Sequence, residues 1–397
     1  MEAYIYEAIR TGRGSIRKNG SLLSVAPVEL MRQLFHALEQ RTPHITEQLE
    51  DIILGCVTQI EAQGTNIAKT AALYAELPDS IPGMTVTRLC TSGLDAIAIA
   101  AAKVQSGQAS LLAAGGVESV STVPMFADKG AWFADPIVAN KSRFVHMGIS
   151  ADLMASLYNI SREEMDLFAA NSHKKAAVAN ANGHSSNAMI PIVNESGELL
   201  LQEDENIRPT TTLDQYAALP PVFEQFLTEQ QRKLIEEQFP ELEAVQFQHT
   251  AGNSPTLADG AALLVIGAKQ NDPSLTPRAK IVGALSVASH PMLLLGGQTA
   301  AEKLMEKHSL SFDDLDVIEF YEAYSATAVK AQKDWQVSDD RFNPNGGVIA
   351  TGHALGATGA ILVVSLIEQL ERKNGRYGLV TLSGGGGVGT AMIIERL

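Results

Sequence analysis

Apolar and polar positions in the first part of the chain follow two different spacings. Apolar residues recur at helical spacing over 28–38, and small residues with a helical pattern fill 94–104. The runs 51–56 and 111–116 are short, apolar and end near glycine or polar residues, as buried strands do. This alternation predicts an α/β arrangement.

The last part of the chain repeats the same order of patterns. Its predicted elements are a helix at 300–307, a strand at 316–320, a helix at 360–370, and strands at 378–382 and 391–394. Cys90 and His353 follow the strands of their halves at nearly the same distance along the chain. Two similar halves would place them at matching helix entrances, facing each other across a pseudo-twofold axis.

Between these parts, residues 118–246 are irregular and polar. We expect this stretch to form a lid or a substrate-binding subdomain, because long excursions from a compact core often carry function. The predicted units are therefore a first half, a loop subdomain inserted into it, and a second half. The first half comprises 1–117 and 247–268, the loop subdomain comprises 118–246, and the second half comprises 269–397.

Composition narrows the classes of function. The chain has 397 residues, 45% hydrophobic residues and a formal net charge of −15, which indicate a globular protein and argue against nucleic-acid binding. The sequence has no uninterrupted apolar run long enough to span a membrane and no apolar signal-peptide core. We therefore expect a cytoplasmic location.

Two cysteines are too few for a disulfide framework or a cysteine-rich zinc site. Cys90 directly precedes a predicted helix, whose dipole and free N–H groups favour a thiolate, so we expect a lowered pKa. The same position also suits a buried structural cysteine, and position alone does not decide between the two. Cys56 ends an apolar strand and is interpreted as structural.

His353 lies in the glycine-rich segment 343–359. Glycines allow the backbone to approach a ligand, and an imidazole there can deprotonate a thiol, whereas the alternative is a core histidine. Residues 383–389 match GxGxxG, but too little chain follows for a dinucleotide-binding unit. A glycine turn that offers N–H groups to an oxyanion fits better. The sequence shows no metal-binding cluster and no nicotinamide site.

An ordered set of motifs is similar to the thiolase family. The motifs are LCTSGLDAI, GGVESVS, HMG, TAGN with DGAA, YEA, GGVIATGHALGATGA and SGGGGVG, and they span nearly the whole chain. The resemblance implies two pseudo-repeated βαβαβαββ halves in a five-layered α-β-α-β-α sandwich, with a loop subdomain in the first half. It also implies thiolytic cleavage of 3-ketoacyl-CoA, or the reverse Claisen condensation.

The resemblance assigns roles to individual residues. Cys90 corresponds to the acylated nucleophile and His353 to its base, while Gly385 and the Cys90 N–H correspond to an oxyanion hole. His146 and Met147 would border the acyl and pantetheine site. The matching coenzyme A contacts are Arg208, Leu219, Phe223, Ala251, Ala323 and Tyr324. Coenzyme A would be a co-substrate, with no permanently bound cofactor.

The chain departs from the family pattern at chemically important positions. Ser383 replaces a second cysteine that exchanges a proton with the substrate carbon, and a hydroxyl is a far weaker acid than a thiol. Tyr321 replaces an asparagine, and either donates its hydroxyl or fills space. Pro255 stands where a serine usually contacts pantetheine. The helix-like insert 224–243 is either a surface decoration or a feature that reshapes substrate access, and its place beside the acyl site favours the second.

The sequence leaves several functions open. One is an active C-acyltransferase for longer or bulkier substrates. Another is a thiolase-like acyl transferase or hydrolase in which Ser383 impairs carbon–carbon chemistry, and a third is a non-catalytic coenzyme A-binding subunit. A ketoacyl synthase is a minor alternative. The stretch 119–146 is short for a tetramer-forming loop, so we expect a homodimer rather than a tetramer.

Overall fold

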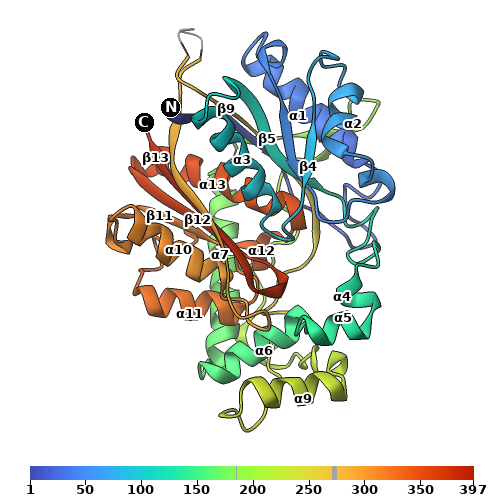
Figure 1. The fold of residues 1–397 in the computed structure, drawn as a ribbon, viewed down its shortest axis with the longest axis vertical. Helices are drawn as coiled ribbons and strands as arrows, with labels where there is room; N and C mark the ends of the chain where they lie inside the picture. Colours follow the sequence, from blue (N-terminus) through green and yellow to red (C-terminus); the bar gives the residue numbers. More distant parts are fainter. Residues whose placement is uncertain (185, 271–274) are drawn as a thin grey trace.

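The computed structural model describes residues 1–184, 186–270 and 275–397, and Figure 1 shows its arrangement. In the first half, β1 (Ala3–Thr11) pairs with β9 (Ala258–Gly267), and β9 pairs with β5 (Leu111–Glu118). Beyond β5 lie β3 (Ile52–Gly55) and the edge strand β4 (Met84–Val86). The pairs β1–β9 and β9–β5 are antiparallel, whereas β5–β3 and β3–β4 are parallel.

The second half repeats this strand order. β10 (Ala279–Ala288) pairs with β13 (Val388–Arg396), which pairs with β12 (Tyr377–Ser383), which pairs with β11 (Val317–Phe320). These pairings are antiparallel, antiparallel and parallel, as in the first half. A short antiparallel pairing of β1 with β10 joins the two sheets edge to edge. The predicted repeat is confirmed.

Helices cover both faces of the two sheets (Figure 1). Two helices lie between the sheets, α3 (Ser92–Gln105) and α13 (Thr358–Lys373), and contact each other and strands on both sides. The outer layers are α1 (Pro27–Arg41) with α2 (Ile67–Tyr74), and α10 (Gly296–Lys307) with α11 (Ser325–Trp335). The predicted five-layered α-β-α-β-α sandwich is therefore confirmed.

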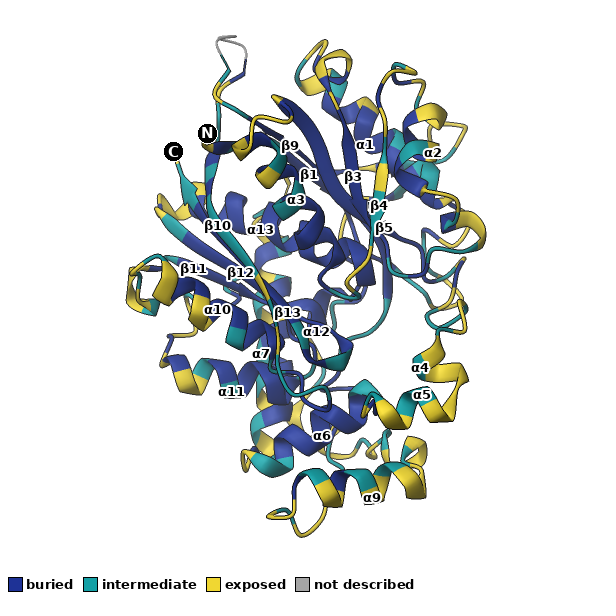
Figure 2. Ribbon diagram, in the orientation of Figure 1, coloured by how far each residue is buried: buried dark blue, intermediate teal, exposed yellow. Residues whose placement is uncertain are grey.

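The composition of α13 explains why it occupies the middle layer. Every residue from Thr358 to Leu370 is buried, because most of them are apolar or small and the polar side chains of Glu368 and Gln369 have hydrogen-bond partners. Figure 2 shows this helix almost entirely in the buried colour. It ends at Asn374, which adopts a left-handed conformation (φ 54°) with its N–H bonded to the last turn.

The excursion between β5 and β9 is more helical than the sequence pattern predicts. Its helices are α4 (Ala131–Ala134), α5 (Pro136–Lys141), α6 (Met147–Leu157), α7 (Arg162–Ala181), α8 (Leu213–Ala217) and α9 (Glu229–Gln238). The longest, α7, begins with a capping box between Ser161 and Glu164. Its buried face mixes alanines with Asp166, Ser172 and His173, so no apolar stripe reveals it in the sequence.

The insert 224–243 forms a 3-10 helix, Glu224–Phe226, followed by α9. Thr228 caps α9, and Ile235 is its buried residue. The helix packs against α5, and Arg143, which follows α5, donates to Gln238 at 3.1 Å. The predicted helix is thus confirmed, but it begins after Phe226.

Shorter elements complete the description. They are β2 (Gly14–Ser15), β6 (Met189–Ile190), β7 (Ile192–Val193), β8 (Leu199–Leu201) and α12 (Val348–Thr351). Among the helices of the described residues, none combines the length and the apolar composition needed to cross a bilayer.

Candidate active site

A cavity of about 280 Å³ lies where the two halves and the excursion meet. Its walls include the predicted residues Cys90, His146, Met147, Phe223, Pro255, Tyr321, Ala323, Tyr324, His353, Ser383 and Gly385. The structure therefore brings together side chains from segments far apart in the sequence. Sequence reasoning did not single out Met125, Ser254, Leu257, Leu294 and Leu355, which also line it. Leu355 lies within the motif GGVIATGHALGATGA and Leu257 lies between TAGN and DGAA, whereas Met125 belongs to none of the quoted motifs.

The backbone holds Cys90 in a sharp turn between β4 and α3. Leu89, immediately before it, has a left-handed conformation with φ 54°, a strained state for a non-glycine residue. Gly93 in the first turn of α3 is also required, since a Cβ there would lie 2.6 Å from the carbonyl oxygen of Gly356. The helix that follows Cys90 thus packs directly on the turn that follows His353.

Donors surround the Cys90 sulfur. The backbone N–H groups of Cys90 and Gly385 and the hydroxyl of Tyr321 lie near it, and each favours the thiolate and so lowers the pKa of Cys90. Two convergent N–H groups are the arrangement expected of an oxyanion hole.

The predicted lowering of the Cys90 pKa is wrong for the ligand-free protein. Burial raises the pKa of Cys90 to about 11, and the hydrogen bonds from Tyr321, Cys90 N–H and Gly385 N–H offset burial only in part. The helix N-terminus favours the thiolate, but removing the thiolate from water costs more. Cys90 is consequently a neutral thiol at neutral pH.

His353 enters the cavity from the second half and is almost completely buried. Its Nδ1 lies 2.8 Å from Oγ1 of Thr358, whereas its Nε2 is buried and has no hydrogen-bond partner among the described residues. When Nδ1 carries the proton and donates to Thr358, Nε2 is free to accept another. Burial, with a smaller effect of the Arg13 charge, lowers the pKa of His353 to about 3, so the ring is neutral.

Ser383 lines the cavity, but its hydroxyl is already engaged. Its Oγ accepts a hydrogen bond from the N–H of Gly297 at 2.8 Å and donates to the carbonyl of Leu294 at 2.9 Å. The hydroxyl thereby satisfies an N–H in the first turn of α10, which has no partner within that helix. Ser383 connects the end of β12 to the start of α10.

The glycine turn after Ser383 approaches the excursion closely. Gly386 has φ 70°, and a Cβ there would lie 2.5 Å from the ring of Trp132 in α4. The turn therefore needs glycine both for its conformation and for space.

Aromatic rings form the wall contributed by the excursion. The ring of His146 stacks on Phe226, at a centroid distance of 4.8 Å, and on Phe223, at 5.6 Å, and the two phenylalanine rings lie 6.4 Å apart. Phe223 in turn meets Tyr324 edge-on at 5.5 Å. Burial lowers the pKa of His146, so this wall is uncharged at neutral pH. Phe226 places the insert directly at the cavity.

Three predicted coenzyme A contacts do not line the cavity. Arg208 lies beside His173, to whose Nδ1 its backbone N–H donates at 2.9 Å. The carbonyl of Leu219 accepts from Arg162 at 3.0 Å, and Ala251 is exposed. A role for these residues requires a ligand that extends beyond the cavity.

Cys56 is fully buried away from the cavity. Its thiol lies 3.8 Å from Oε1 of Glu118, and burial followed by the charge of Glu118 raises its pKa far above the usual range. These surroundings agree with a structural cysteine.

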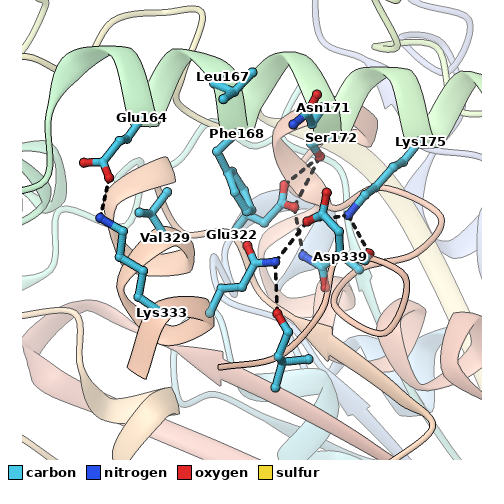
Figure 3. A pocket seen from close by; sticks show the side chains of 13 residues that line it. Glu164, Leu167, Phe168, Asn171, Ser172, Lys175, Glu322, Val329, Lys333 and Asp339 are labelled. Atoms are coloured by element: carbon cyan, nitrogen blue, oxygen red, sulfur yellow. Dashed lines mark hydrogen bonds and ion pairs between the residues drawn. The ribbon is translucent and has the colours of Figure 1, made fainter. Parts of the chain in front are cut away.

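A second hollow of about 370 Å³ lies between α7 and α11 (Figure 3). Four of its charged side chains form ion pairs, Lys333 with Glu164 and Lys175 with Asp339. Glu322 accepts from Ser172, as Figure 3 shows, and also from Asn343 at 2.8 Å. We therefore assign the chemistry to the Cys90 cavity.

Comparisons with known proteins agree with this geometry. The Thiolase, N-terminal domain family matches residues 3–228, and the Thiolase, C-terminal domain family matches residues 275–396. The chain is 38% identical to the 3-oxoadipyl-CoA/3-oxo-5,6-dehydrosuberyl-CoA thiolase of Escherichia coli (strain K12), and 100% of both chains is covered. It is 36% identical to the 3-ketoacyl-CoA thiolase of Salmonella typhimurium (strain LT2), again over 100% of both.

A solved structure shows the same fold. The acetyl-CoA acetyltransferase of Bacillus anthracis superposes with a TM-score of 0.85 at 31% identity, covering 100% of this chain and 99% of the other. With both family domains and the full-length relatives, this likeness shows that the chain belongs to the thiolase family and is a thiolase-type acyl-CoA C-acyltransferase.

Proposed function

We propose that Cys90 is the acylated nucleophile and His353 its base. The observation that carries this proposal is the partnerless Nε2 of buried His353 in the same cavity as Cys90. A neutral imidazole accepts the thiol proton as the sulfur attacks, so a preformed thiolate is unnecessary. The N–H groups of Cys90 and Gly385, which face the sulfur, then stabilise the oxyanion.

The reaction follows in two acyl transfers. Cys90 Sγ attacks the 3-keto carbon of a 3-ketoacyl-CoA, and the bond between C2 and C3 breaks, leaving acyl-Cys90 and acetyl-CoA. Coenzyme A then attacks the acyl-Cys90 thioester, His353 receives the proton of the incoming thiol, and Cys90 leaves. The reverse sequence is a Claisen condensation. Coenzyme A is a co-substrate in this scheme.

We infer a neutral acyl group as the substrate class. Apolar and aromatic side chains dominate the cavity, and no Lys or Arg is among the described residues that line it. The name of the Escherichia coli relative refers to an oxoadipyl thioester, whose acyl chain ends in a carboxylate. Burying that carboxylate without a cation is costly, so we expect kcat/KM to be higher for neutral 3-ketoacyl-CoAs than for ω-carboxylated ones.

The excursion 118–246 remains our proposed coenzyme A-binding subdomain. It supplies the aromatic wall of His146 and Phe223, and its Arg208 suits a phosphate group outside the cavity. The remaining predicted contacts, Leu219, Ala251 and Pro255, fit the same path for the pantetheine arm.

A homodimer, a cytoplasmic location and a role in fatty acid metabolism also remain predictions. Support for the dimer comes from β4, which lies at the end of the strand order with one unpaired side. An exposed strand edge is suited to pairing with another chain. Analytical ultracentrifugation distinguishes a dimer from a monomer or a tetramer.

Mass spectrometry of the whole protein after incubation with a panel of acyl-CoAs tests the proposed function. We expect an acyl adduct on the Cys90 peptide, its loss in Cys90→Ala, and its retention in the control Cys56→Ala. An adduct on Cys56, or full activity of Cys90→Ala, contradicts the assignment. Absence of any adduct favours a non-catalytic binding subunit.

The engaged hydroxyl of Ser383 favours one alternative, a thiolase-like acyl transferase or hydrolase without carbon–carbon chemistry. This alternative predicts acyl-Cys90 without release of acetyl-CoA from a 3-ketoacyl-CoA. Release of acetyl-CoA by wild type rejects it.

A further inference from the structure

Cleavage between C2 and C3 creates a proton requirement that Ser383 does not meet. The departing C2 leaves with the bonding electron pair and must receive a proton to become the methyl group of acetyl-CoA. Ser383 donates its hydrogen to the carbonyl of Leu294, while its oxygen accepts from Gly297. Breaking these bonds would leave two buried backbone groups without partners.

Tyr321 is placed where the missing donor is needed. Its side chain comes from the end of β11, is almost completely buried and lines the same cavity as Cys90. It lies close enough to Cys90 to lower the pKa of the thiol, whose sulfur forms the new bond to C3. C2 is bonded to C3, so a donor on the sulfur is also within reach of C2 when the bond breaks.

Tyr321 also has a route by which to recover its proton. Its ring and the ring of His353 lie 4.8 Å apart between centroids, at an angle of 44°. His353 holds the proton taken from Cys90 during attack, so it is a local source for the tyrosinate. The two rings and the sulfur thus form one compact group.

We propose that the Tyr321 hydroxyl protonates C2 during carbon–carbon cleavage, in place of the engaged Ser383. This inference rests on the acyl-Cys90 chemistry proposed above. The proton of Cys90 passes to His353, the C2–C3 electron pair takes the proton of Tyr321, and His353 then returns its proton to the tyrosinate. In the second transfer His353 takes the proton of coenzyme A and delivers it to Cys90, which restores every group.

The neighbouring Tyr324 is less suited to this role. Its ring makes edge contacts with Phe223 at 5.5 Å and with His249 at 5.4 Å, within the aromatic wall. Tyr321 instead contacts both the nucleophile and its base.

Two assays on the full-length enzyme separate this step from acylation. The first measures cleavage of a 3-ketoacyl-CoA in deuterated water, with deuterium in the acetyl-CoA methyl group as readout. The second measures exchange of labelled coenzyme A into a simple acyl-CoA, which needs acyl-Cys90 but no C2 protonation. For Tyr321→Phe we expect cleavage to fall about 10²–10⁴-fold and exchange to fall less than about tenfold.

Matched variants make the result decisive. Tyr6→Phe removes another buried tyrosine hydroxyl, which donates to the carbonyl of Ala268, and should leave both rates unchanged. An equal loss of both rates in Tyr321→Phe, undiminished cleavage, or a greater loss of cleavage in Tyr324→Phe overturns the proposal. Failure of wild type to exchange coenzyme A instead overturns the acyl-Cys90 function itself.

Discussion

Burial shifts the pKa values of Cys90 and His353, the two central groups of the cavity, in opposite directions. It raises the pKa of Cys90 to about 11 and lowers that of His353 to about 3, because each shift disfavours the charged form. The ligand-free site therefore holds a thiol and a neutral imidazole rather than an ion pair. Proton transfer has to accompany attack on the substrate.

This state predicts a steep pH dependence of Cys90 alkylation. Only the thiolate reacts, so the rate of labelling by iodoacetamide should rise about tenfold per pH unit between pH 7 and 10. Peptide mass spectrometry should show Cys90 labelled before Cys56, with protection by coenzyme A. A rate independent of pH over this range would mean that a thiolate already exists at neutral pH.

The hydrogen bonds of Ser383 stabilise the fold, so alanine substitution should lower the free energy of unfolding. Ser383→Ala leaves the Gly297 N–H and the Leu294 carbonyl without their partner, so the free energy of unfolding should fall by about 1–3 kcal/mol. Chemical denaturation measures this change. Ser365→Ala is the control, because the described part of the chain shows no side-chain hydrogen bond for Ser365; an equal effect in both variants would contradict the interpretation.

At the scale of elements, the spacing of apolar residues predicted the helices and strands of the repeated core but not the helices of the excursion. The strand at 111–116 and the helix at 360–370 stand out because burial on several sides makes them predominantly apolar or small. Helix α7 escaped detection because alanines and the buried polar residues Asp166 and His173 replace the usual apolar stripe. The position of Cys90 was predictable from motifs, whereas its pKa depends on surroundings supplied by distant segments.

The insert 224–243 should control acyl-chain preference through Phe226. Its ring stacks on His146 and lines the cavity, so Phe226→Ala should raise kcat/KM for long acyl chains relative to short ones, by about tenfold or more. Steady-state kinetics with a chain-length series measures the ratio. Leu234→Ala changes a half-buried residue of the same insert outside the cavity lining and should leave the ratio unchanged.

Replacing the whole insert with a short Gly-Ser bridge extends the same test. We expect a larger change in chain preference than in fold stability, because only two residues of the insert, Ile235 and Phe239, are buried. An unaltered preference would make the insert a surface decoration.

At the scale of the whole molecule, a buried ion network ties the excursion to the first strand. Asp204 contacts Arg10 and Arg13, each at 3.0 Å, and all three side chains are nearly inaccessible. Burial alone would raise the pKa of Asp204, but the two arginine charges outweigh it and hold the pKa well below its usual range. The charged carboxylate is therefore the form that stabilises the fold.

This network predicts that the stability difference between wild type and Asp204→Asn depends on pH. A depressed folded-state pKa contributes stability above the ordinary value of about 4, which is lost as the pH falls toward the folded-state value. Asp204→Asn should therefore cost about 3–5 kcal/mol at pH 7 and progressively less below pH 4. Denaturation at several pH values tests this. Asp339→Asn, at an exposed ion pair, should change little, and a pH-independent cost for Asp204→Asn would contradict the account.

The burial of α13 between the sheets has a consequence for how the enzyme is inactivated. This helix belongs to the second half, yet it packs against β1, β5 and β9 of the first as well as β11 and β12 of its own. Neither half can separate from the other without exposing a helix whose residues from Thr358 to Leu370 are all buried. Heat should accordingly melt the chain in one cooperative transition, with catalytic loss and calorimetric melting coinciding, and separately expressed halves should recover activity only when refolded together.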